Sequence, residues 1–209
     1  MPPIVYFRLI WERCNQLSVI HSYMIGHVTG ILSVDEILRS EWVARVSALD
    51  LYVHELAAQR MLEIFEGLRQ KTPAFEQLKI PYETMNRIRS APSAVAASAA
   101  FDLEVRNHLS RKTFQYPDDI ADAIRLFSSI ELWNEVAVNM GASLATKHNA
   151  AKQLKKDLSL IINRRNKIAH EGDLQPTQPR QPWAIDASEL AFVKQTIEDI
   201  VGAFEAILA

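Results

Sequence analysis

Apolar residues recur every three or four positions along most of this chain, the spacing that places them on one face of an α-helix. The pattern predicts a first helix over about residues 4–23, ended by the glycines at positions 26 and 30. It then predicts a long helix over about 33–68, with an apolar face that must be buried. The apolar stripe of this long helix consists of Leu38, Trp42, Val46, Leu49, Val53, Leu56 and Ile64.

Prolines divide the middle of the chain into shorter helices. Pro73, Pro81 and Pro92 interrupt this region, and its most helical part is 93–109. Pro117 is well placed at the first position of a further helix, because that position needs no backbone N–H donor. We therefore expect several short helices here.

The last third of the chain predicts two helices joined by a proline-rich loop. The first helix, over about 149–170, is strongly basic, and Gly172 ends it. The second runs over about 186–208, with Asp186 or Ser188 as its N-cap. No alternating strand pattern and no internal repeat occurs, so the sequence predicts an all-α protein. We expect one domain, a helical bundle with extra short helices over residues 1–209.

The composition is that of a globular protein. The 209 residues are 48% hydrophobic and 23% charged, and the net charge of −2 excludes a polycation that binds nucleic acid through its overall charge. Cys14 is the only cysteine, which excludes an intrachain disulfide and a four-cysteine zinc site. Charges at positions 8, 12 and 13 argue against a signal peptide or membrane span. We therefore expect a cytoplasmic protein with no membrane partner.

The helix over 149–170 and the residues just before it carry a local excess of positive charge against one acid, Asp157. Such an excess suits contact with phosphates, although a solvated basic helix face would have the same composition. A second basic cluster, 106–112, includes Arg111 and is open to the same two interpretations. The basic residues of the first cluster are Lys147, Lys152, Lys155, Lys156, Arg164, Arg165 and Lys167.

Arg165 is out of place in the apolar pattern of this helix. At helical spacing it falls in the row of Leu154, Leu158, Ile161 and Ile168. Burying an unpaired guanidinium costs several kcal/mol, so Arg165 should face a cleft or have a carboxylate partner. The long helix offers two candidate partners, Asp50 and Glu55.

The neighbours of Arg165 suggest a chemistry. Asn166 and His170 are four residues apart and share one flank of the helix. A histidine can transfer protons in the cleavage of an RNA phosphodiester, and an arginine can hold the charge that develops on the phosphate, without a metal or other cofactor. Candidate RNA contacts are Arg164, Lys167, Lys156 and Arg111. A metal site built from His170, Glu171 and Asp173 is disfavoured, because three ligands this close in sequence seldom converge on one ion.

The stretch RRNKIAHEGD, at the end of a helix in an all-α chain, resembles the signature of the HEPN superfamily. The surrounding sequence is similar to the RiboL-PSP-type branch, in stretches that cover most of the chain from about residue 30 onward. The resemblance implies a metal-independent endoribonuclease that acts as a homodimer, with the motifs of two protomers forming one composite site. Arg165 would bind the scissile phosphate, Asn166 would orient groups in the site, and His170 would transfer protons.

The same resemblance implies a role in a toxin–antitoxin or antiphage system, with an antitoxin or another regulatory protein as a partner. Some toxins of the family carry a regulatory tyrosine two residues after the histidine, where this chain has Gly172, so control by modification of that tyrosine is not expected. The alternative is a non-catalytic HEPN module that dimerises and binds RNA, a nucleotide or a protein. In that case Arg165 would form a structural ion pair.

Overall fold

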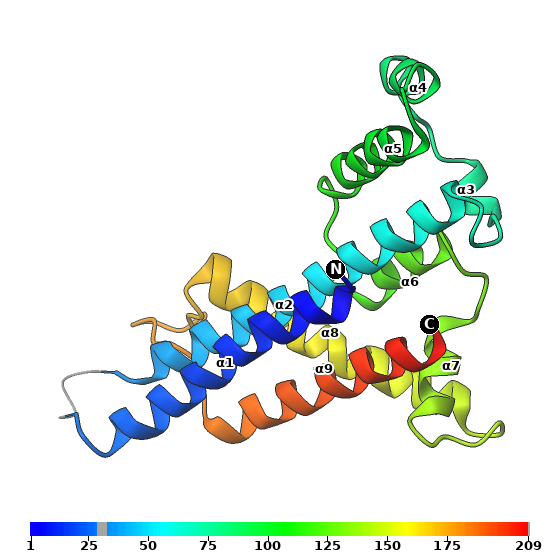
Figure 1. Ribbon diagram of the computed structural model, residues 1–209. Helices are drawn as coiled ribbons and strands as arrows, with labels where there is room; N and C mark the ends of the chain where they lie inside the picture. Colours follow the sequence, from blue (N-terminus) through cyan, green and yellow to red (C-terminus); the bar gives the residue numbers. More distant parts are fainter. Residues whose placement is uncertain (29–32, 209) are drawn as a thin grey trace. The chain divides into compact units, whose positions relative to one another are not determined.

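A computed structural model describes residues 1–28 and 33–208, and these residues form helices joined by turns and loops (Figure 1). The all-α prediction is confirmed, because the only β pairing among them is an isolated bridge between Leu174 and Pro182. Gly30, which was expected to help end the first helix, lies outside the described residues. The helices are α1 (Pro3–Ile25), α2 (Asp35–Phe65), α3 (Pro73–Glu76), α4 (Tyr82–Arg89), α5 (Ala94–Leu109), α6 (Pro117–Arg125), α7 (Leu132–Asn139), α8 (Lys147–Glu171) and α9 (Ala187–Ile207).

Local signals account for the ends of several helices. Pro117 is the first residue of α6, as predicted. Gly172 ends α8 with φ of 62°, a left-handed conformation that glycine adopts without steric cost. Asp186 is the N-cap of α9, and it forms a capping box in which its carboxylate accepts hydrogen bonds from the backbone N–H groups of Ser188 and Glu189. The hydroxyl of Ser188 also donates to this carboxylate at 2.6 Å, and that hydrogen bond is the main reason that the pKa of Asp186 lies below its usual range.

The chain divides into two compact units, and α2 contributes to both. One unit comprises Met1–Pro3 and Asp50–Leu132, and the other comprises Ile4–Leu49 and Trp133–Ala209. The motif helix α8 belongs to the second unit, which is called the motif unit below. That the chain forms one domain over 1–209 stays a prediction.

The motif unit is built from α1, the first half of α2, and α7 to α9. The indole N–H of Trp42 in α2 donates to the backbone carbonyl of Ile161 in α8 at 3.0 Å, and α8 also contacts α9. Full burial of one large apolar side chain stabilises a fold by roughly 1.5–3 kcal/mol, so the buried core of this unit contributes more to its stability than the intrinsic helix propensities of its residues. Its buried apolar residues include Phe7, Trp11, Cys14, Leu38, Val46, Leu49, Leu158, Ile161, Ile162, Val193, Ile197, Ile200 and Phe204.

The other unit has its own core, formed by the second half of α2 with α5 and α6. The rings of Phe65 and Phe101 stack with their centroids 4.3 Å apart. The hydroxyl of Thr72 donates to the backbone carbonyl of Leu126 at 2.8 Å, which fixes the turn before α3. Further buried apolar residues are Val53, Leu56, Met61, Ile64, Val105, Leu109, Ile120 and Ile124.

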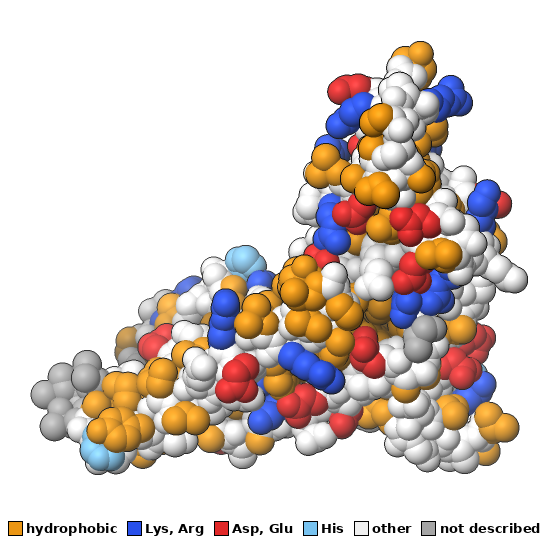
Figure 2. All heavy atoms as spheres, in the orientation of Figure 1, with side chains coloured by type: hydrophobic (Ala, Val, Ile, Leu, Met, Phe, Trp, Pro, Cys, Tyr) orange, Lys and Arg blue, Asp and Glu red, His pale blue; other side chains and the backbone are white. Residues whose placement is uncertain are grey.

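Several large apolar side chains remain exposed on α1, and Figure 2 shows hydrophobic side chains over the part of this helix nearest its C-terminal end. They are Val5, Leu9, Val19, Ile20, Tyr23 and Ile25. Across residues 1–28 and 33–208, none of the helices combines the length and the apolar character needed to span a membrane.

Candidate functional site

The motif lies in the last two turns of α8, where the helix has a buried face and an exposed face. Leu158 and Ile161 are buried, and Arg165 lies within about 60° of them around the helix axis at 100° per residue. Lys156 and Lys167 lie on the opposite, exposed face. Arg165 therefore belongs to the apolar side of the helix, as the sequence pattern predicted.

Arg165 is half-buried, and its guanidinium makes one hydrogen bond in the described part of the chain. Nη1 donates to Oδ1 of Asn166 at 3.1 Å. Its Nε is buried and has no hydrogen-bond partner. A guanidinium has five N–H donors, and those of Nη2 have no partner among the described residues, so Arg165 has unused capacity to bind an anion.

The two carboxylates that were expected to pair with Arg165, Asp50 and Glu55, have hydrogen-bond partners within their own unit. Asp50 accepts hydrogen bonds from the backbone N–H of Phe114 at 2.6 Å and from the side-chain amide of Gln115 at 3.1 Å. Glu55 accepts from Nη1 of Arg106 at 2.6 Å, a contact that raises the pKa of Arg106. Both carboxylates thus have partners within their own unit, and their pairing with Arg165 stays a prediction.

His170 lies in the last turn of α8 with its side chain exposed, and its ring forms no hydrogen bond with the described residues. It is one helical turn after Asn166, about 40° away around the axis. Five residues separate it from Arg165, which is about 140° around the same axis. The structure thus joins Arg165 to Asn166 by a hydrogen bond, and no hydrogen bond links His170 to either of them.

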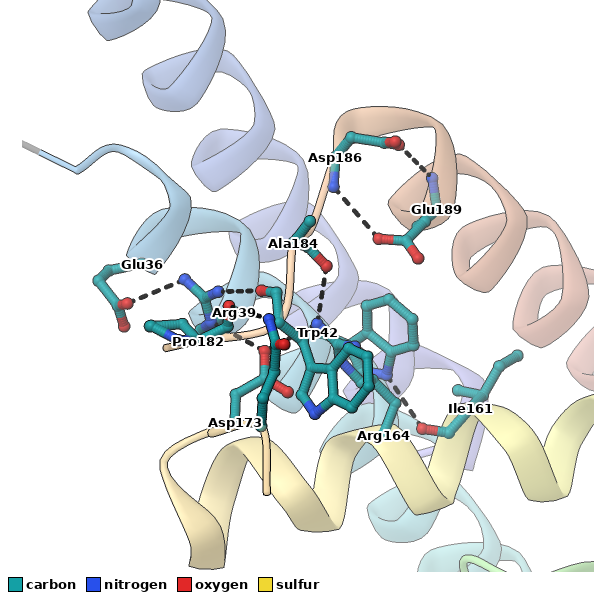
Figure 3. Close-up of polar contacts among 12 residues, drawn as sticks. Glu36, Arg39, Trp42, Ile161, Arg164, Asp173, Pro182, Ala184, Asp186 and Glu189 are labelled. Atoms are coloured by element: carbon teal, nitrogen blue, oxygen red, sulfur yellow. Dashed lines mark hydrogen bonds and ion pairs between the residues drawn. The ribbon is translucent and has the colours of Figure 1, made fainter. Parts of the chain in front are cut away.

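Arg164, a predicted RNA contact, instead has a structural role. Its Nη2 donates to Oδ2 of Asp173 at 2.8 Å and to the backbone carbonyl of Ala184 at 2.9 Å. Arg39 of α2 donates through Nε to the same carboxylate oxygen at 3.0 Å (Figure 3). These contacts give Arg164 a structural role, and a contact of Arg164 with RNA stays a prediction.

These three side chains, Arg39, Arg164 and Asp173, form what we call the Asp173 cluster (Figure 3). Asp173 is 0% exposed, and Arg39 is 5% exposed. Arg39 also donates to the carbonyl of Trp183 at 2.6 Å and pairs with Glu36 at 2.9 Å. Sequence analysis missed this role of Asp173, and the local sequence carries no signal for it, because the pairing depends on Arg39, 134 residues away in the chain.

The proline-rich segment after α8 is an ordered loop that returns to the Asp173 cluster. The N–H of Trp183 donates to the carbonyl of Asp173 at 2.8 Å, and the N–H of Gln175 donates to the carbonyl of Gln181 at 2.8 Å. The peptide bond between Gln178 and Pro179 is cis. Through these contacts the loop holds the end of the motif helix against α2.

The exposed face of α8 carries cations that have no acidic partner among the described residues. Lys152, Lys156 and Lys167 lie within about 60° of His170 around the helix axis. The ammonium of Lys167 also lies over the ring of Trp183, 5.8 Å from its centroid. Arg111, the other predicted RNA contact, is exposed in the turn after α5, in the other unit.

No group of three or more histidine, cysteine, aspartate or glutamate side chains in the described parts of the chain is arranged to hold a metal ion. The disfavoured site at His170, Glu171 and Asp173 is excluded by a direct observation, because Asp173 is buried between two arginines.

The chain matches no protein-family model, no curated protein and no solved structure. The resemblance to the HEPN superfamily therefore rests on the motif residues and stays a prediction.

Proposed function

We propose that this protein is a metal-independent endoribonuclease of the HEPN type, with Arg165, Asn166 and His170 as its catalytic residues. The observation that supports this most strongly is the end of α8 itself. His170 is exposed and has no hydrogen-bond partner among residues 1–28 and 33–208, and within the same residues the guanidinium of Arg165 binds Asn166 alone.

The chemistry divides among these side chains. His170 takes the proton from the 2′-hydroxyl or gives one to the leaving 5′-oxygen. Arg165 holds the charge that develops on the phosphate, and the amide of Asn166 keeps the guanidinium in place through the 3.1 Å hydrogen bond. The products are then a 2′,3′-cyclic phosphate and a 5′-hydroxyl.

The separation of Arg165 and His170 around the helix axis supports a composite site in a homodimer. Because the two side chains leave one helix about 140° apart, a second copy of the motif would supply the group that a single chain does not bring near the phosphate. The unpaired lysines beside His170 would then contact the RNA backbone on either side of the cleaved bond.

The test compares RNA cleavage by the wild type and by His170→Ala in the presence of EDTA. His148→Ala is the matched control, because His148 is an exposed histidine at the start of the same helix. Loss of a general acid–base typically reduces the rate about 10²- to 10⁴-fold, so His170→Ala should lose at least a hundredfold and His148→Ala should retain full activity. Equal cleavage by wild type and His170→Ala, or cleavage that requires a metal, would overturn the proposal.

A second experiment tests the composite site. Arg165→Ala and His170→Ala protomers, each inactive alone, should recover part of the activity when they are mixed and allowed to exchange. Light scattering on the wild type should give the mass of a dimer. A monomer that cleaves RNA, or mixed protomers that stay inactive while the dimers exchange, would contradict a shared site.

We further propose that the activity serves toxin–antitoxin or antiphage defence and is restrained by a partner protein. Expression of the wild type in bacterial cells should then arrest growth and leave RNA fragments with cyclic phosphate ends, whereas His170→Ala should do neither. Unaltered growth and RNA in cells that contain active enzyme would remove the defence role while leaving the nuclease assignment in place.

A further inference from the structure

Trp183 is the tryptophan that the fold leaves on the surface. The chain has four tryptophans, and Trp11, Trp42 and Trp133 are buried. Trp183 is 38% exposed and lies in the loop between α8 and α9. Single exposed apolar side chains are common in proteins, so the exposure of Trp183 is informative only together with the way its ring is held and the groups that surround it.

The loop holds Trp183 through its backbone. Its N–H donates to the carbonyl of Asp173 at 2.8 Å, and its own carbonyl accepts from Nη2 of Arg39 at 2.6 Å. Asp173 and Arg39 are the buried members of the Asp173 cluster. The position of Trp183 is therefore fixed by contacts that its indole does not make. A side chain on such an anchored backbone is preorganised, so it loses little conformational freedom when it binds a ligand.

The ring of Trp183 lies beside the motif at the end of α8. The ammonium of Lys167 lies over this ring, 5.8 Å from its centroid. Lys167 directly follows Asn166 and precedes His170 by three residues, which is about 60° around the helix axis and about 4.5 Å along it. An aromatic ring and a cation thus lie next to the residue proposed to transfer protons.

This combination of side chains suits an unpaired nucleotide. The face of its base stacks on an aromatic ring, and its phosphate is an anion that a lysine binds. In a duplex the bases stack on one another, so their faces are not open to a side chain. An exposed indole beside a lysine therefore favours single-stranded RNA over double-stranded RNA.

We propose that Trp183 selects single-stranded RNA by stacking on the base of a nucleotide beside the cleaved bond, an inference that rests on the proposed nuclease function. Lys167 binds the phosphate of that nucleotide. Trp183 thus determines which RNA is bound, whereas Arg165 and His170 act on the reacting atoms.

The first test uses a single-stranded 2′-O-methyl RNA oligonucleotide, which lacks the attacking hydroxyl and is bound without being cleaved. Because the other three tryptophans are buried, a base that stacks on Trp183 should quench the fluorescence of the exposed indole. Trp183→Phe should abolish this quenching and keep the affinity within about threefold, since phenylalanine also stacks on bases. The same oligonucleotide paired with its complement should bind at least about tenfold more weakly.

The second test measures cleavage of single-stranded RNA. Trp183→Leu should raise KM at least about tenfold, the effect of one lost stacking contact, and leave kcat within about threefold. Phe192→Leu is the matched control, because Phe192 is an exposed aromatic residue on α9 of the same unit, and it should leave KM unchanged. His170→Ala should lose cleavage, yet the oligonucleotide should quench its fluorescence as in the wild type.

The outcomes separate this inference from the nuclease assignment. The stacking role is overturned if the wild type shows no quenching, if the duplex binds as tightly as the single strand, or if Trp183→Phe binds no better than Trp183→Leu. Normal cleavage with an unchanged KM in Trp183→Leu would also overturn it and leave the nuclease in place. Quenching without any cleavage of RNA would instead overturn the nuclease assignment and support Trp183 as a residue that stacks on RNA.

Discussion

The Asp173 cluster makes a strong prediction about the stability of the motif unit. Asp173 is fully buried, and one of its oxygens accepts hydrogen bonds from two arginines of different helices, at 3.0 and 2.8 Å. Asp173→Asn keeps the shape of the side chain and removes its charge. The positive φ of 56° at this position is one that asparagine tolerates better than most residues, so the substitution adds little backbone strain.

The size of the effect follows from what the arginines lose. Removing one member of a buried ion pair costs about 3–5 kcal/mol when the remaining charge has no other partner. Arg39 keeps its contacts to the carbonyl of Trp183 and to Glu36, and Arg164 keeps the carbonyl of Ala184. We therefore expect Asp173→Asn to lower the free energy of unfolding by about 2–3 kcal/mol, below the full cost of an unpaired charge.

The assay is urea unfolding followed by tryptophan fluorescence. All four tryptophans of the chain lie in the motif unit, so the signal reports on that unit. Asp157→Asn is the matched control, because Asp157 lies on α8, the helix of Arg164, and among the described residues it accepts a hydrogen bond from the amide of Gln153 and forms no ion pair. We expect Asp157→Asn to lower the free energy of unfolding by less than about 0.5 kcal/mol.

A double-mutant cycle with Arg39→Met then measures the pairing itself. Met keeps the apolar stem of the arginine, so the coupling between the two substitutions reports on the charge contact and should exceed about 1 kcal/mol. Additive effects of Arg39→Met and Asp173→Asn, or a cost for Asp173→Asn no larger than that of the control, would refute the reasoning.

Two further substitutions test local features of the two units. Burial alone would raise the pKa of Glu63, but hydrogen bonds from Arg60 and Arg69 hold that pKa below its usual range, so ionised Glu63 stabilises the fold fully above the unfolded pKa of about 4.3 and this stabilisation is lost as the pH falls through the lower folded value. Urea unfolding followed by circular dichroism should show that the difference in free energy of unfolding between wild type and Glu63→Gln shrinks over that pH range. A difference that does not depend on pH would contradict this prediction. Gly172→Ala should lower the free energy of unfolding in the tryptophan assay by roughly 1 kcal/mol, because alanine is strained at a φ of 62°. The new Cβ would meet Leu174 at an ordinary 3.8 Å, so no steric clash adds to this cost. An unchanged free energy of unfolding would show that the turn relaxes.

The sequence predicted well the features that depend on residues close together in the chain, namely the positions of the longer helices and some of their ends. The helical period identified α1, α2, α5, α8 and α9 to within a few residues, because an apolar face repeats along a helix whatever it packs against. Gly172 and Asp186 marked helix ends, since each acts on the backbone within a few residues of itself. The sequence also placed Arg165 on the apolar side of α8, where the structure has it half-buried.

The partners of the charged side chains could not be predicted from sequence. Arg164 and Arg165 are adjacent arginines on one helix, yet Arg164 is paired with Asp173 and Arg165 donates to Asn166. Which of the two pairs with a carboxylate depends on the loop after α8 and on Arg39, which is 134 residues away from Asp173 in the chain. The local pattern singles out Arg165 as the charge on the apolar side, but it does not indicate which arginine has a carboxylate partner.

The sequence by itself thus determined where the helices begin and end and which residues could carry the proposed chemistry. Only the tertiary structure decided that Asp50 and Glu55 have partners of their own and that Asp173 is buried between two arginines. The physical reason is the separation along the chain over which each kind of interaction acts. Helix formation and capping depend on groups a few residues apart, whereas the pairing of a buried charge depends on which distant segments the core brings against it.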